Sequence, residues 1–103
     1  MIFSSGLFGQ DPQTGDVPDD AAGQARFVFE NLRALLANGD AKLEDVVHVT
    51  VFVRDNSVRE ALNAEWIKCF PDPADRPARH TLVQNLPGKL LLQIEVVAVV
   101  QGV

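Results

Sequence analysis

The chain has 103 residues and a formal net charge of −5 at pH 7. This length suits one domain with a single core, and the 47% of hydrophobic residues excludes a disordered chain. Affinity for nucleic acid rests largely on Lys and Arg that neutralise phosphates, so the acidic balance argues against a nucleic-acid partner. We therefore expect one globular domain that spans residues 1–103.

Cysteine usage and hydropathy bear on the compartment. Cys69 is the only cysteine, so no internal disulfide can form, and one cysteine with two histidines cannot build a closed zinc site. No apolar run approaches the roughly 20 residues that a membrane helix needs, and the first residues do not resemble an export signal. The sequence predicts a cytoplasmic protein that does not contact a membrane and requires no metal or other cofactor.

The first predicted elements are a strand and a helix. Ile2 to Ser5 is a strand candidate that ends at Gly6. Asp19 or Asp20 can cap a helix that runs to about Asn38, where Asn38-Gly39 is a stop signal. An apolar stripe at three- and four-residue spacing supports this helix, and it consists of Ala22, Ala25, Phe29, Leu32 and Leu36.

A second strand and a second helix follow. Residues 45–55 alternate as a strand does, with Val47, Val49, Val51 and Val53 on one face and Val46, His48, Thr50 and Phe52 on the other. The helix is predicted to begin at Ser57, because Ser57-Val58-Arg59-Glu60 has the form of a capping box. Its apolar stripe is Val58, Leu62, Trp66 and Cys69 or Phe70.

The last strand, predicted over residues 89–100, is rich in apolar residues on both faces. One face carries Leu90, Leu92, Ile94, Val96, Ala98 and Val100, and the other carries Leu91, Gln93, Glu95, Val97 and Val99. Strands of this kind must be covered on both faces, and two helices can cover only one side of a sheet. A second copy of the chain is the economical cover for the other side, so we expect a closed homo-oligomer.

Arg79 follows Pro-Ala at the start of a further strand, ahead of the Leu-Pro-Gly-Lys turn. The last strand, with Gln93 and Glu95, is a candidate to pair with it. A permanently charged, forked donor beside a sheet suits a carboxylate ligand. An ion pair between Arg79 and Glu95, or a charge at an interface, is the alternative role for this arginine.

Two segments, Arg-Pro-Ala-Arg at residues 76–79 and the run from Asn85 to Val100, resemble the signature of the Rid family, the reactive intermediate (imine) deaminases or YjgF-type proteins. Residues 2–26 resemble the family's first strand, Ser-Gly turn, Pro-x-Thr-Gly loop and first helix. The segments Leu43–Asp55 and Ala61–Trp66 also fall in the family's order. The resemblance therefore covers nearly the whole chain.

The resemblance implies a chorismate-mutase-like α+β fold, with two helices on one face of a mixed, mostly antiparallel sheet, assembled as a homotrimer. It implies hydrolysis of 2-imino or 2-enamine acids to 2-keto acids and ammonia in pockets between subunits. By resemblance Arg79 holds the substrate carboxylate, Ser5 and Gly6 match the family's pocket Ser-Gly, and Asn63 matches an asparagine of its second helix. Some members have been described as ribonucleases, which the acidic charge does not favour here.

The sequence departs from the family pattern at the catalytic position. The water-activating glutamate of the family falls on Gln93, whose amide can bind water but cannot remove its proton, and Glu95 matches a second glutamate. Glu95 lies on the same strand face as Gln93, about 6.5 Å further along. One prediction, from the resemblance, is imine deamination with Arg79, Gln93 and Glu95 in the site. A trimer that binds small carboxylic metabolites without catalysis is the alternative.

Overall fold

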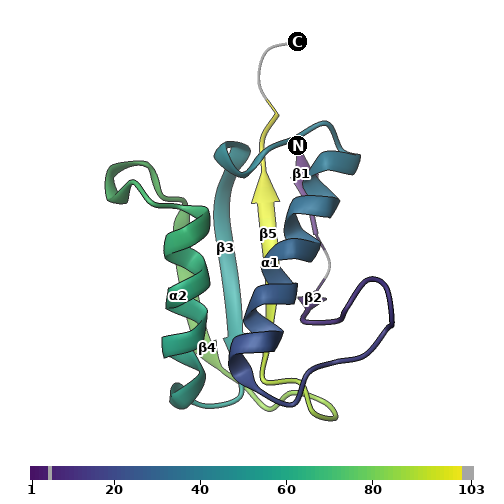
Figure 1. Cartoon of the computed structure of the whole chain (residues 1–103). Helices are drawn as coiled ribbons and strands as arrows, with labels where there is room; N and C mark the ends of the chain where they lie inside the picture. The colour runs from purple at the N-terminus through teal and green to yellow at the C-terminus, as the bar shows by residue number, and fades with distance from the viewer. Residues whose placement is uncertain (5, 101–103) are drawn as a thin grey trace.

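The computed structural model describes residues 1–4 and 6–100. Seven elements appear along the chain: β1 (Ile2–Phe3), β2 (Leu7–Phe8), α1 (Ala21–Asn38), β3 (Val46–Val53), α2 (Arg59–Cys69), β4 (Ala78–Val83) and β5 (Leu92–Ala98). Short 3₁₀ turns at Leu43–Asp45, Asn56–Val58 and Pro73–Asp75 precede β3, α2 and β4. Figure 1 shows α1 and α2 side by side on one face of the sheet. The predicted α+β architecture with two helices on one face of a mixed sheet is confirmed.

The order of the strands differs from the predicted pairing. The sheet runs β1-β5-β3-β4, with β2 also paired to β5. The β3–β4 pair is parallel because α2 returns the chain across the sheet between them, whereas β5 pairs antiparallel with β1, β2 and β3. The expectation that the strand of Arg79 pairs with the strand of Gln93 and Glu95 is wrong, because β3 lies between them.

The first helix agrees with its prediction. Asp20 is the N-cap, and its side chain accepts a hydrogen bond from the Gly23 N–H at 3.0 Å. The helix ends at Asn38, with Gly39 as its C-cap. Of the predicted stripe, all members except Ala22 are buried, since Ala22 lies in the first turn and is exposed.

Three local predictions are corrected. The first strand covers only Ile2–Phe3, and Ser5 lies outside the described residues. Asp55, not Ser57, provides the cap before α2: its carboxylate accepts from the Ser57 N–H, and a 3₁₀ turn intervenes before the helix begins at Arg59. A β-bulge between Val46 and His48 breaks the alternation, so Val46 is buried while Val47 is exposed.

The two faces of the sheet have different surroundings. On the face under the helices, which we call the helix face, Val49, Val51, Ile94 and Val96 pack against Phe29, Leu32 and Leu62 in the core. The opposite face, called the open face, carries side chains from β1, β3, β4 and β5, and no described element covers it (Figure 1). Within the described part of the chain, neither helix has the length and apolar character that crossing a bilayer demands.

Candidate functional site

Arg79 lies on β4, an edge strand, and its side chain is on the helix face. Its partner in the β3–β4 register is the buried Val49, and paired residues of neighbouring strands point to the same side. The guanidinium carbon lies 4.9 Å from the ring centroid of Trp66 on α2. This distance is within the range of a cation–π contact, so Trp66 supports the head group of Arg79.

The charge of Arg79 has no protein counterion among residues 1–4 and 6–100. Its Nη1 atom is buried and has no hydrogen-bond partner there. Burial is the main cause that lowers the pKa of Arg79 from its ordinary value, and the positive charges of Arg59 and Arg76 lower it further. A buried donor without a partner is costly, so this guanidinium is poised to accept an anion from outside the chain.

Thr81 and Asn63 lie on the two elements beside this guanidinium, Thr81 on β4 and Asn63 on α2. Thr81 pairs with Val51 and therefore lies on the helix face two residues beyond Arg79, where its hydroxyl is also buried without a described partner. Asn63 is exposed on α2, and it is four residues after Arg59 and three before Trp66, so the three share one helix face. Arg79, Thr81 and Asn63 thus gather at the edge between α2 and β4.

Gln93 and Gly6 meet at a different place. Gln93 pairs with Phe52 on β3 and with Phe8 on β2, which places it on the open face. Its amide lies so close to Gly6 that a Cβ at position 6 would overlap the Gln93 Nε2 atom, so any larger residue there would displace the Gln93 amide. The structure therefore brings Gly6 and Gln93 together, while Ser5 lies outside the described residues.

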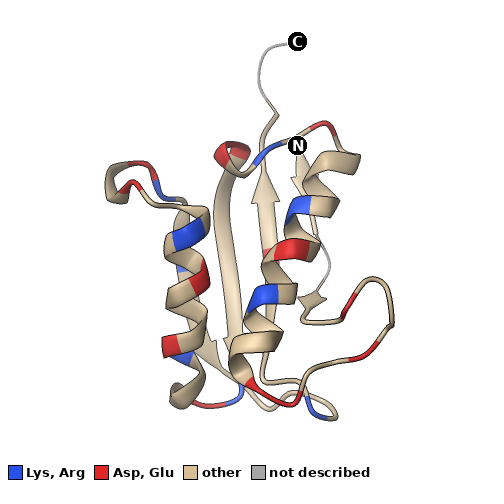
Figure 2. Cartoon of the chain, in the orientation of Figure 1, with Lys and Arg blue, Asp and Glu red and all other residues tan. Residues whose placement is uncertain are grey.

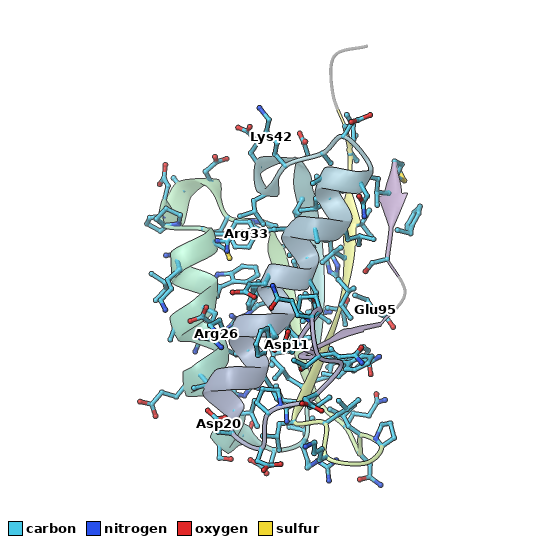
Figure 3. All side chains as sticks on the ribbon, turned by 45° about the vertical axis from the view of Figure 1, so that its right-hand side comes forward. Asp11, Asp20, Arg26, Arg33, Lys42 and Glu95 are labelled. Carbon is cyan, nitrogen blue, oxygen red and sulfur yellow. The ribbon has the colours of Figure 1, made fainter. Side chains whose placement is uncertain are left out.

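Glu95 is the next outward residue of β5 on the open face. It pairs with Thr50 and is exposed. Figure 3 shows it on the side of the sheet away from both helices. Within one copy of the chain Arg79 and Glu95 do not form the alternative ion pair, because their side chains lie on opposite faces of the sheet.

One copy of the chain does not unite the predicted site residues. Arg79 and Gln93 are on opposite faces, and β3 separates their strands, which places the two backbones about 10 Å apart. Four surface hollows have volumes of about 290, 280, 410 and 300 Å³, and Arg79 lines none of them. The last of these hollows is lined by Gly6. The residues therefore form two half-sites: Arg79, Thr81 and Asn63 at the α2–β4 edge, and Gly6 and Gln93 beside β2.

Comparisons with known proteins place the chain in a family. A family model described as endoribonuclease L-PSP matches residues 1–100. The 2-iminobutanoate/2-iminopropanoate deaminase of Escherichia coli K12 is 38% identical over 101 residues, which are 96% of this chain and 79% of that protein. The chain belongs to the Rid family. The resemblance predicted from the sequence is thereby confirmed.

Solved Rid structures share the fold. The yjgF gene product of Escherichia coli superposes with a TM-score of 0.86 at 34% identity, over 96% of this chain and 80% of that one. Escherichia coli TdcF, solved with bound serine, superposes with a TM-score of 0.87 at 31% identity, over 96% and 80% of the two chains.

Sequence reasoning missed two residues that position the half-sites of this Rid protein. Gln24 is fully buried on α1, donates to the carbonyls of Pro18 and Lys89, and accepts from the Leu91 N–H. Arg54 donates to the carbonyls of Leu86, Gly88 and Leu90, and so holds the turn that leads into β5. Neither residue has a pattern in the sequence, because the partners are backbone atoms and all except Pro18 are more than 30 residues away.

Proposed function

We propose that this Rid protein hydrolyses 2-imino acids, or their 2-enamine tautomers, to 2-keto acids and ammonia. The observation that carries the proposal is the guanidinium of Arg79, partly buried on Trp66 without a described counterion. A substrate carboxylate would satisfy it with a charge-assisted, forked pair of hydrogen bonds. The names of the relatives support this chemistry, and the serine bound to TdcF is a small molecule of the amino-acid class.

Each half-site has a separate role in this reaction. Arg79 fixes the carboxylate, and Asn63 and Thr81 offer hydrogen bonds to the polar atoms next to it. Gln93, packed over Gly6, holds the water that attacks C2, and Glu95 is the nearest carboxylate along the same face of β5. Holding the water and the imine carbon in the right geometry can supply much of the rate enhancement of a hydrolysis. The imine carbon is already electrophilic, so it reacts with a water that is held in place.

A homotrimer would bring the two half-sites together. The α2–β4 edge of one copy would face β2 and the open face of the next, so that Arg79 and Gln93 come from different subunits. Apolar side chains on the open face support this assembly: Phe3 is 71% exposed and Leu82 is 48% exposed. Further copies of the same chain are the occupants that would remove this surface from water.

Replacing Leu82 by Asp should disrupt the trimer. Burying an unpaired carboxylate in an apolar interface costs several kcal/mol, so the association constant should fall by roughly a hundredfold or more. Size-exclusion chromatography with light scattering should give three times the 11.2 kDa chain mass for the wild type and a smaller mass for Leu82→Asp. Ala34→Asp, which places the same charge on the exposed side of α1, should remain trimeric. A wild-type monomer would contradict the assembly.

The central test follows keto-acid formation from an imine generated by a pyridoxal-dependent dehydratase. The wild type should accelerate keto-acid release above the rate in buffer. Gln93→Glu should act at least about tenfold faster than the wild type, because it adds a general base where water is held. Gln84→Glu, the same change at an exposed position after β4, should match the wild type.

Two results would contradict this account in different ways. If the wild type does not exceed the buffer rate and only Gln93→Glu does, the natural protein is a binder of carboxylic metabolites. If neither protein is active and neither binds a 2-keto acid, the deaminase chemistry does not apply to this chain.

A further inference from the structure

Three of the six arginines of this acidic chain gather at the α2–β4 edge: Arg59, Arg76 and Arg79. The Nε of Arg76 donates to the carbonyl of Phe70 at 2.7 Å, and the Phe70 ring lies 4.6 Å from that of Trp66. Arg79 stacks on the same Trp66. Arg76 is therefore held by the backbone at the end of α2, and Arg79 by the ring of Trp66 one turn earlier in the helix.

Arg59 approaches the same edge from the start of α2. Its Nη2 lies 3.5 Å from the carbonyl oxygen of Thr81, which is two residues beyond Arg79 on β4. Its Nε donates to the Asn56 side chain at 2.8 Å, which fixes the guanidinium at this end of the helix. We call Arg59, Arg76 and Arg79 the arginine triad.

No carboxylate compensates the triad in the part of the chain that the structure describes. The ion pairs found there are Lys42–Glu44, Lys68–Glu65 and Lys89–Asp19, and none involves an arginine. Figure 2 shows both basic and acidic positions on α2 and on the loop between α2 and β4, but none of these carboxylates forms an ion pair with an arginine among the described residues. Like charges held together repel each other, so the triad favours a ligand that carries more than one negative charge.

We infer that the preferred substrate class is the 2-imino dicarboxylic acids, an inference that rests on the proposed deaminase function. Arg79 takes the carboxylate next to the imine carbon, and the positive field of Arg59 and Arg76 on either side of it attracts the second carboxylate. A monocarboxylic ligand would neutralise only one of the three charges. The hydrolysis is unchanged: the oxygen of water bonds to C2, both hydrogens of that water pass to the imine nitrogen, the C–N bond breaks, ammonia leaves, and a 2-keto dicarboxylate remains.

Product binding tests the inference without relying on turnover. Calorimetry should give a dissociation constant for 2-oxoglutarate, which has two carboxylates, about tenfold below that for 2-oxobutanoate, which has one. Trp66 is the only tryptophan, so its fluorescence reports whether each acid binds beside Arg79. Arg59→Gln and Arg76→Gln should each reduce the ratio of the two constants to below about threefold. Arg26→Gln, the same change on α1, should keep the wild-type ratio.

Equal affinities of the wild type for the two acids, or a preference that survives the combined Arg59→Gln and Arg76→Gln substitutions, would overturn the inference. In either case the proposed function stands if the wild type still deaminates monocarboxylic imines. Absence of both binding and deamination would overturn the two proposals together. Arg59 is half-buried and Arg76 is exposed, so the variants should fold, and thermal unfolding checks this.

Discussion

Arg79→Ala should lower kcat/KM for imine hydrolysis by roughly a hundredfold or more, because a lost charge-assisted contact to a carboxylate costs about 2–5 kcal/mol. The measurement is keto-acid release coupled to the dehydratase, with the rate in buffer subtracted. Arg79→Lys should fall between wild type and Arg79→Ala. Lysine keeps the charge but lacks the planar fork.

The same substitution should leave the stability of the fold unchanged or higher. Arg79 is a partly buried cation beside two other arginines and has no counterion among the residues described, so its removal relieves repulsion and desolvation. Only its stacking on Trp66 is lost. A loss of activity with an unchanged unfolding midpoint identifies a ligand-binding residue. Wild-type activity in Arg79→Ala would refute the proposed carboxylate contact, and Arg26→Ala is the matched control.

Gln24→Leu should lower the free energy of unfolding by about 3 kcal/mol or more. Leucine has a similar volume but leaves the carbonyls of Pro18 and Lys89 and the N–H of Leu91 without their side-chain partner, and each unsatisfied buried group costs about 1–3 kcal/mol. For a chain of this size the thermal midpoint should fall by roughly 15 °C. Circular dichroism at one fixed protein concentration measures this shift.

Gln13→Leu is the matched control for Gln24→Leu. Gln13 is exposed in the loop before α1, and only its backbone N–H is hydrogen-bonded, to Asp11. The thermal unfolding midpoint of Gln13→Leu should therefore stay within about 2 °C of the wild-type midpoint. A similarly small shift for Gln24→Leu would show that water or local rearrangement replaces the three hydrogen bonds. Gln24 would then not be what positions residues 89–91 and the start of β5.

Local patterns predicted most elements of this fold correctly. The first helix depends on an acidic cap and a three- and four-residue apolar stripe, both of which lie within a few residues of each other. The cap of the second helix was misread, because Asp55 competes with Ser57 for the same turn and its carboxylate is the stronger acceptor. The bulge after Val46 also escaped prediction, since a bulge depends on the partner strand β5.

The candidate site also has features that the sequence predicted and features that only packing decides. The family motif around Arg79 identified the residue, and its chemistry follows from the guanidinium alone. The support from Trp66 and the proximity of Arg59 and Arg76 were not predictable, because these residues meet only when α2 packs beside β4. Gln93 and Gly6, about 87 positions apart, become neighbours only through the pairing of β2 with β5.

The amino-acid sequence by itself determined the helices, the strands, the family and the presence of a forked cation next to a Pro-Ala step, because each depends on neighbouring residues or on a motif. Tertiary structure alone decided that Arg79 faces the helices while Gln93 and Glu95 face the opposite side. The physical reason is the strand order. A parallel crossover through α2 places β3 between β4 and β5, and the register with β3 then sets which side each side chain takes.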